Sequence, residues 1–234
     1  MNENYQNLFY LGVIVLVLSL GSYFIFKNFS PSNLSKESVE SKFFQEVNTK
    51  VDLGSLPPLG FEGAEIKIVE FGDFHCPFCA LAANYLYPEL KKYVSLQKVV
   101  FYFRDFPLES LHPQVKKVHL ASRCANEQGK YWEFHKEIYA EVFKALNEKR
   151  DYFFTAGDEY LLNLASRLEL DTEKFKTCLQ EKKYESDINK DIVEGNNYSV
   201  EGTPTFFIIK NNKVYKGSGF IPELMHEFRN IIEK

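Results

Sequence analysis

The chain has 234 residues, of which 45% are hydrophobic and 26% charged, and this composition is typical of a folded globular protein rather than a disordered or collagen-like one. Its 28 Lys and Arg against 32 Asp and Glu give a formal net charge of -4, and no basic stripe runs along the sequence, so we do not expect nucleic-acid binding. Four cysteines are too few for a small domain held together by disulfides, so their positions matter more than their number.

The first feature along the chain is an uncharged, apolar run at residues 8–26. A helix of this length would reach about 28 Å, close to the thickness of the hydrocarbon layer of a membrane. A cleaved signal peptide is the alternative, but the run is longer than the usual hydrophobic region, and no small-x-small motif follows it closely. We therefore expect residues 1–27 to be an N-terminal membrane anchor. The flanking charges do not set its orientation.

Residues 28–60 are more polar and end at a Pro-Pro pair, which is typical of a linker. Within them Val39, Phe43 and Val47 recur every fourth residue. This spacing places the three side chains on one helical face and predicts a short helix docked on the domain that follows.

The rest of the chain shows a pattern of strands and helices. Strands are expected at residues 66–71, 99–103, 205–209 and 214–217, and helices at 80–93 and 222–234. The intervening block from about residue 112 to 197 carries helical spacing and no convincing strand. This order predicts an α/β sheet that carries a helical insertion.

The motif Cys76-Pro77-Phe78-Cys79 lies where the first of these strands ends and the first helix begins. The first turn of a helix has unpaired N–H groups and the positive end of the helix dipole, which favour a thiolate at Cys76. Pro77 suits the first helical position because the N–H it lacks has no partner there. Cys79 lies one turn inside, so Cys76 is the expected nucleophile and Cys79 the resolving thiol.

A zinc site is the main alternative for such a motif, because zinc sites also use Cys-x-x-Cys. Cys124 and Cys178 are isolated, and the histidines form no paired ligand motif. We therefore expect no metal.

Two separated motifs resemble the DsbA-like branch of the thioredoxin superfamily, and in particular its membrane-anchored bacterial thiol-disulfide oxidoreductases. The first is EFGDFHCPFC at residues 70–79, and the second is VEGTPTF at residues 200–206. Residues 123–135 are similar to the helical insertion of that branch. The resemblance runs from about residue 64 to the C-terminus and implies a thioredoxin fold with an inserted helical subdomain, here preceded by one transmembrane helix.

Composition at the N-terminus and this resemblance from about residue 64 onward together predict five segments. They are an N-terminal membrane anchor (1–27), a linker with a short helix (28–60), the first part of the thioredoxin fold with the Cys-x-x-Cys motif (61–111), the inserted helical subdomain (112–197) and the second part of the fold (198–234).

The resemblance also implies roles for three further residues. Pro204 would follow a cis peptide bond, and Thr203 would present its backbone to the cysteine pair, where it can pair with an extended substrate. Without the family, a proline at the first position of a strand is the simpler interpretation. Glu70 would be a buried acid that relays protons to Cys79, whereas its simpler interpretation is a charged residue at a strand edge.

Two residues depart from the family pattern. Phe78 stands where the strongly oxidising relatives have His, and Thr203 precedes the proline as in some isomerases and reductases. The exchange chemistry is therefore better defined than the direction of electron flow. Phe74, Phe78 and Phe220 are candidates for an exposed apolar surface that attracts unfolded polypeptide.

Cys124 and Cys178 both fall in the predicted helical block. A disulfide between them would close a loop of about 55 residues, worth on the order of 4 kcal/mol in the chain-entropy model. We expect this structural disulfide. Two buried reduced thiols and a second redox relay are the alternatives.

These observations predict a thiol-disulfide oxidoreductase that introduces disulfide bonds into extracytoplasmic proteins without a bound cofactor. By resemblance, its substrates would be unfolded or reduced proteins, and a quinone-linked membrane oxidoreductase would reoxidise it. Disulfides persist in oxidising compartments, so the domain should lie outside the cytoplasmic membrane on its single-pass anchor. A disulfide isomerase or reductase with the same site, and a non-catalytic peptide-binding or metal-binding module, are the alternatives.

Overall fold

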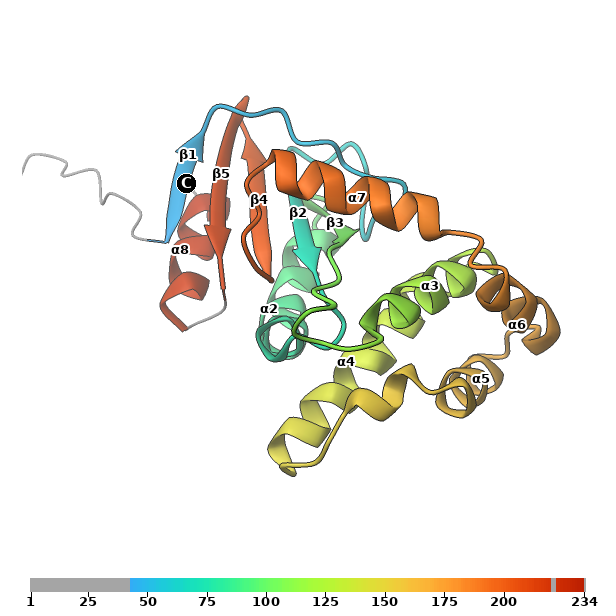
Figure 1. Cartoon of the computed structure of the whole chain (residues 1–234). Coiled ribbons are helices and arrows are strands. Elements are labelled where there is room, and N and C mark those ends of the chain that lie inside the picture. The colour runs from blue at the N-terminus through green and yellow to red at the C-terminus, as the bar shows by residue number, and fades with distance from the viewer. Residues whose placement is uncertain (1–42, 220–221, 234) are drawn as a thin grey trace, which may run out of the picture. The chain divides into compact units, whose positions relative to one another are not determined.

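The structure is a computed structural model that describes residues 43–219 and 222–233 (Figure 1). The predicted anchor at residues 1–27, Val39 and Phe220 lie outside these ranges. No helix within the described ranges combines the length and the apolar character that a membrane crossing requires.

A five-stranded mixed sheet forms the centre of the domain, in the order β1-β5-β4-β2-β3. β2 and β3 are parallel, and the other neighbouring pairs are antiparallel. The strands are β1 (Phe44–Val47), β2 (Ile66–Gly72), β3 (Val99–Asp105), β4 (Thr205–Lys210) and β5 (Lys213–Ser218).

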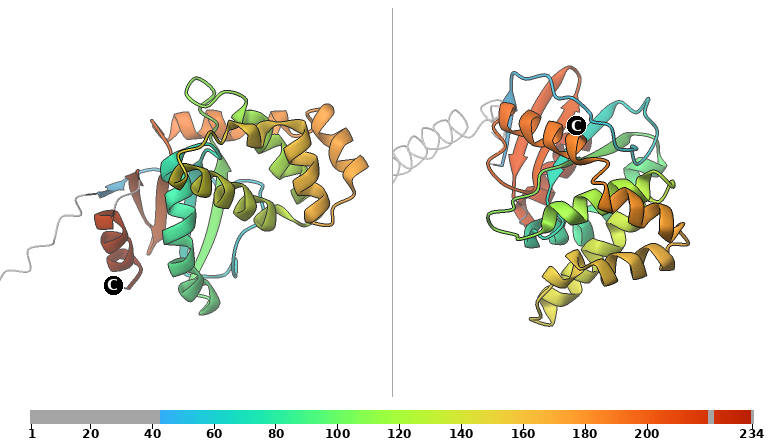
Figure 2. Two further views of the ribbon diagram at one scale, coloured as in Figure 1. Left: turned by 90° about the horizontal axis from the view of Figure 1, so that it is seen from below. Right: turned by 45° about the vertical axis from the view of Figure 1, so that its right-hand side comes forward.

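Helices cover both faces of this sheet (Figures 1 and 2). α2 (Pro77–Ser95) and α8 (Pro222–Glu233) pack on one face, against Ile66 and Ile68 of β2. α7 (Glu185–Asn197) covers the other face, on which Phe71 of β2 is buried. Because successive side chains of a strand point to opposite faces, the even-numbered positions of β2, including residue 70, face α2.

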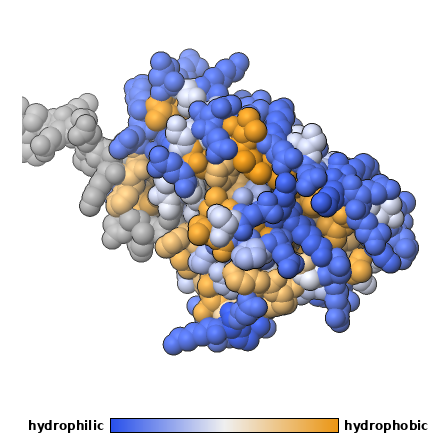
Figure 3. All heavy atoms as spheres, viewed as in Figure 1, coloured by the Kyte–Doolittle hydropathy of each residue, from blue (hydrophilic) through white to orange (hydrophobic). Residues whose placement is uncertain are grey.

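The predicted helical insertion is confirmed. Residues 112–197 contain α3 (Val115–Asn126), α4 (Tyr131–Asn147), the short 3-10 helix η2 (Phe153–Ala156), α5 (Asp158–Arg167), α6 (Thr172–Gln180) and α7, which covers the sheet. These helices share one apolar core that extends to the start of α2. Figure 3 shows apolar residues between the strands and the insertion, whereas the outer end of the insertion is mainly hydrophilic.

The prediction of a short helix in the linker is wrong for residues 43–47, the part of that helix that the structure describes. Phe44–Val47 is strand β1, which pairs antiparallel with β5 at the edge of the sheet. The Phe44 side chain is 2% exposed. A Cβ atom at position 217 would lie only 2.7 Å from its ring, which is too close, so the ring fits here because residue 217 is glycine. The backbone hydrogen bonds offered by β5 and the space left by Gly217 therefore outweigh the local four-residue spacing.

A buried network of charged side chains connects the sheet to α3 and α7. Arg104 of β3 donates to Asp191 of α7 at 2.9 Å, and it also pairs with Glu194. Arg123 of α3 donates to Asp191 at 2.7 Å and to Asp105 of β3 at 2.5 Å. Charges buried at this depth are tolerated only when they are paired. The network therefore fixes the positions of β3, α3 and α7 relative to one another.

Candidate active site

Cys76 lies at the junction between β2 and α2. It is the cap residue of α2 and has an extended backbone, and Pro77 takes the first helical position. The Cys76 N–H donates to the Asp73 carbonyl at 3.0 Å, and the Cys76 carbonyl accepts from the Ala80 N–H at 3.0 Å. This local geometry places the sulfur of Cys76 at the N-terminal end of the helix, where an anion is favoured.

The second motif lies directly beside this cysteine. The Cys76 thiol donates to the Thr203 carbonyl at 3.1 Å, and the Thr203–Pro204 peptide bond is cis. β4 begins at Thr205 and pairs with β2, where Thr205 lies opposite Phe71. Adjacent strands therefore bring together two loops that are far apart in the sequence.

Cys76 and Cys79 are free thiols with different ionisation properties. The hydrogen bond from Cys79 is the largest cause that lowers the pKa of Cys76, to about 6, and the Thr203 side chain and the Cys79 N–H lower it further, whereas burial raises it. Burial raises the pKa of Cys79 well above its ordinary value, and the charges of Cys76 and Glu70 add to this increase. Near neutral pH, Cys76 is therefore a thiolate and Cys79 a thiol.

Glu70 of β2 lies beneath the cysteine pair, on the face that α2 covers. Its side chain is fully buried, and the Tyr87 hydroxyl donates to its Oε2 at 2.7 Å. Burial raises the pKa of Glu70 to about 8, and the Cys76 charge adds to this shift, whereas the Tyr87 bond opposes it. Glu70 therefore carries a proton at neutral pH.

An acid–base pair that the sequence did not predict joins Asp73, in the loop before the motif, to His112, in the loop after β3. The buried Asp73 carboxylate accepts from the His75 N–H at 2.7 Å and the Leu108 N–H at 2.6 Å, and His112 Nδ1 lies 3.0 Å from its Oδ2. Burial favours the neutral imidazole of His112, but its hydrogen bond to Asp73 and the charges of Asp73 and Cys76 raise its pKa overall. The pairing with Asp73 therefore favours the protonated form of His112, whose pKa the nearby Cys76 charge also raises.

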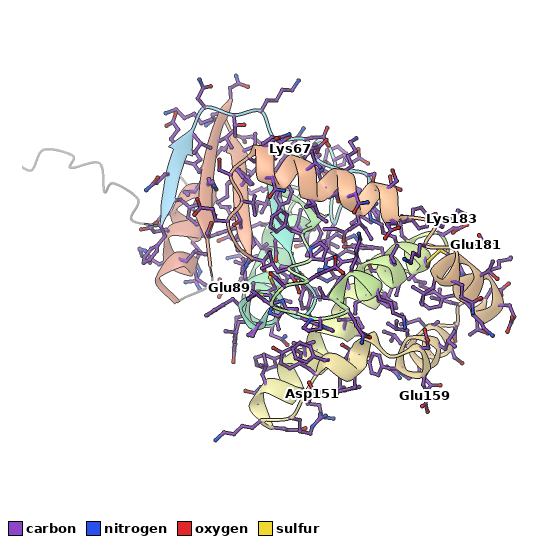
Figure 4. All side chains as sticks on the ribbon, in the orientation of Figure 1. Lys67, Glu89, Asp151, Glu159, Glu181 and Lys183 are labelled. Atoms are coloured by element: carbon purple, nitrogen blue, oxygen red, sulfur yellow. A yellow bond between two sulfur atoms is a disulfide. The ribbon has the colours of Figure 1, made fainter. Side chains whose placement is uncertain are left out.

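His75 precedes the nucleophile but does not supply positive charge. Burial lowers its pKa to about 4, against the opposing charge of Asp73, and its Nε2 lies 2.8 Å from Thr155 Oγ1. Asp151, which Figure 4 labels in the segment before η2, also acts on this imidazole. Among the residues that the structure describes, no group of three or more His, Cys, Asp or Glu side chains is placed to hold a metal ion.

The aromatic residues near the site divide into two groups. Phe78 is 51% exposed next to the cysteines, whereas Phe74, which we expected at the surface, is fully buried. Its ring packs between His119 and Tyr139, with centroid distances of 4.7 and 5.1 Å. Phe153 of η2 is also exposed, and its ring centroid lies 5.3 Å from that of His75. Exposed apolar area thus flanks the site from α2 and from the insertion.

The other two cysteines are joined to each other. Cys124 of α3 and Cys178 of α6 form a disulfide with a Cα–Cα distance of 5.9 Å, and both are buried. This bond lies within the helical insertion.

Comparison with known proteins agrees with the geometry of the fold. The family model described as Thioredoxin matches residues 55–233. The chain is 30% identical over 156 residues to the probable disulfide bond formation protein D of Bacillus anthracis, covering 65% of this chain and 69% of that protein. It is also 33% identical over 145 residues, 62% of this chain, to the Na(+)/H(+) antiporter NhaA 3 of Salinispora tropica, of which it spans 20%.

Solved structures lead to the same fold. The alpha-DsbA1 structure from Wolbachia pipientis has a TM-score of 0.63 and 26% sequence identity, covering 77% of this chain and 92% of that one. The BdbD structure from Bacillus subtilis in its oxidised form has a TM-score of 0.60 at 24% identity, covering 76% and 91%.

Proposed function

Because this chain belongs to the thioredoxin family, in its DsbA-like branch, we propose that it is a thiol-disulfide oxidoreductase that introduces disulfide bonds into extracytoplasmic proteins. The observation that carries the proposal is the unequal pair of thiols at the start of α2. Cys76 has a pKa of about 6 and contacts the Thr203 carbonyl, whereas Cys79 is kept as a thiol.

The reaction begins with the Cys76–Cys79 disulfide. A substrate thiolate attacks the Cys76 sulfur, the Cys76–Cys79 bond breaks, and Cys79 leaves as a thiolate that takes up a proton. A second substrate thiolate then attacks the substrate sulfur of this mixed disulfide, and Cys76 leaves as a thiolate. The substrate loses two electrons to form its disulfide, and the cysteine pair gains them.

Glu70 is placed to supply the proton that Cys79 needs. It is protonated at neutral pH, and its charge when ionised raises the pKa of Cys79. Transfer of this proton to the leaving sulfur makes the opening of the disulfide harder to reverse. In the closing direction Glu70 accepts the proton again.

The substrate is held by backbone and apolar contacts. Thr203 precedes the cis proline beside Cys76, so its backbone is placed to pair with an extended peptide. The exposed rings of Phe78 and Phe153 offer apolar area to an unfolded chain.

The low pKa of Cys76 favours electron flow from the substrate to the cysteine pair. A thiolate stabilised in the reduced protein makes the disulfide a stronger oxidant. Residues 1–27 would anchor the domain to the outer face of the cytoplasmic membrane, where a quinone-linked membrane oxidoreductase would reoxidise the pair. Because the chain spans about a fifth of the first curated relatives that it matches, these partners are part of the proposal.

Oxidation of a reduced, unfolded test protein measures this function. The wild-type chain is expected to form disulfides in it, Cys76→Ser to form none, and Cys79→Ser to accumulate mixed disulfides visible on non-reducing gels. Undiminished oxidation by Cys76→Ser would reject the mechanism. A reduction potential near that of thioredoxin, about -270 mV, would instead assign a reductase.

A further inference from the structure

A cavity of about 400 Å³ lies between α2 and α4, away from the substrate face of the cysteine pair. Its α2 wall includes Ala83 and Tyr87, and its α4 wall includes His135 and Tyr139. The Thr203–Pro204 loop contributes nothing to its lining. A bound substrate that covers Cys76 would therefore leave this cavity open.

Tyr87 connects the cavity to the buried carboxyl group. It lines the cavity and is partly exposed, and its hydroxyl donates to Glu70 at 2.7 Å. Its ring stacks on that of His135, with a centroid distance of 5.5 Å and an interplanar angle of 16°. Glu70 itself has no exposed surface, so Tyr87 is the side chain that joins it to accessible space.

Polar atoms along this wall can hold water. Glu70 Oε1 and His135 Nε2 are buried and have no hydrogen-bond partner among the described residues. Pro88, which lies inside α2 and lines the cavity, has no N–H to donate to the carbonyl of Asn84. A buried water molecule needs two to four such partners, and the cavity is large enough for several of them.

The exchange reaction requires this kind of route. Opening the disulfide transfers one proton from Glu70 to Cys79, and a route that avoids Cys76 lets Glu70 regain a proton from solvent while the substrate is still bound there. We propose that Glu70 exchanges protons with solvent through the cavity between α2 and α4, and that Tyr87 is the positioning residue that links its carboxyl group to this cavity. The purpose of this route rests on the proposed function, but its existence does not.

This proton transfer does not require Tyr87 to ionise. Tyr87 gives its hydroxyl proton to the Glu70 carboxylate while a water molecule in the cavity gives one to the Tyr87 oxygen. One O–H bond breaks and one forms at the phenol, so its charge does not change. The titratable groups around Glu70 are Cys76 at the start of α2, Cys79 and Tyr87 of α2, and Tyr131 and Tyr139 of α4.

Hydrogen–deuterium exchange of the Glu70 carboxyl group tests the route. The full oxidised chain at pH 6 is mixed rapidly into D₂O, and the carboxylic C=O stretch is followed by infrared spectroscopy, with Glu70→Gln assigning the band. Tyr87→Phe is expected to slow this exchange at least about tenfold, because a general acid–base group contributes about 10² to 10⁴ to a proton-transfer rate. If Tyr87 had only a structural role, its replacement would not change the exchange rate of the Glu70 carboxyl group in the folded protein.

Tyr93→Phe is the matched control. Tyr93 also lies on α2 and donates to a carboxylate, that of Glu233 at 2.5 Å, but it does not line the cavity. This variant should exchange within twofold of wild type. Ala83→Leu, which narrows the cavity at its α2 wall and keeps the Tyr87 hydroxyl, should also slow exchange.

An exchange rate in Tyr87→Phe equal to that of wild type would overturn the inference. Slower exchange in Tyr87→Phe but not in Ala83→Leu would show that the cavity is not the route. A chain that oxidises no thiols but shows the expected exchange pattern would reject the proposed function and leave the route intact.

Discussion

Two thiols three positions apart differ in acidity because their surroundings differ. Cys76 receives hydrogen bonds at a helix start, whereas Cys79 is fully buried inside the first turn. Alkylation of the reduced protein with iodoacetamide should therefore modify Cys76 alone, with a rate that rises through a midpoint near pH 6. Cys79→Ala removes the largest cause of the shift and should move the midpoint upward by at least one pH unit. A wild-type midpoint near 8.5 would contradict the assignment.

Glu70 lowers stability at the pH at which it serves the reaction. Its carboxyl group ionises near 4.5 when unfolded and near 8 when folded, so between these values the unfolded state binds fewer protons, and stability falls as pH rises. Glu70→Gln removes this fall. It should raise the free energy of unfolding at pH 7 by about 3 kcal/mol, with no gain at pH 4 and a constant gain above pH 8.

Urea unfolding of the oxidised protein at several pH values measures this effect. Glu62→Gln, at an exposed position, is the control and should show no pH-dependent gain. A Glu70→Gln gain that is independent of pH would show that burial of the charge is not its cause.

Residue-scale prediction from the sequence worked where the chemistry is local. The position of Cys76 at a helix start followed from a strand, a proline and an apolar spacing that all lie within one segment. The Asp73–His112 pair could not be found in this way, because it depends on the path of the loop after β3. Asp73 next to the motif was the available sign, but its partner depends on tertiary structure.

At the scale of elements, the buried network of charged side chains fixes the position of α7 on the sheet. Asp191 accepts from Arg104 and Arg123, so Asp191→Ala leaves both guanidinium groups short of a partner. Breaking a buried pair on one side costs about 3 to 5 kcal/mol. We expect a loss of this size in the free energy of unfolding. Arg150→Ala breaks the exposed pair with Glu148 and should change stability little.

Thermal and urea unfolding of the two variants give this comparison. Equal stabilities for Asp191→Ala and Arg150→Ala would mean that water or local rearrangement replaces the buried carboxylate. The helical spacing of residues 112–197 predicted α7 as a helix but not its buried ion pairs, since charged residues inside a helix normally indicate a solvated face.

Strand β1 shows the limit of spacing arguments for short segments. A four-residue strand gains its stability from the partner strand rather than from its own pattern, and Phe44 has its place only because residue 217 is glycine. The longer elements were predicted with the correct type because their periodicity extends over several turns or a whole buried strand.

At the scale of the whole molecule, sheet order creates the site. β2 ends at the cysteine motif and β4 begins at the cis proline, and their antiparallel pairing places the two ends side by side. The sequence alone contained both motifs but not the strand order. The resemblance to a known family implied that the two motifs lie together, whereas periodicity and composition did not.

The disulfide of the insertion acts on stability without taking part in the exchange. Cys124 and Cys178 are 54 positions apart and join α3 to α6, so the bond restricts a long loop in the unfolded chain. Replacing both with Ala should lower the free energy of unfolding by about 4 kcal/mol in the chain-entropy model. The reduction potential of the Cys76–Cys79 pair should stay within about 15 mV of wild type, less than a fourfold change in the equilibrium constant.

The double variant is required, because a single replacement leaves a free buried thiol able to pair with the active site. Urea unfolding of the oxidised proteins measures the loss, and equilibration with glutathione buffers measures the potential. A potential that shifts by 30 mV or more, a tenfold change in the equilibrium constant, would make the second disulfide a redox partner of the first and favour the relay over the structural role.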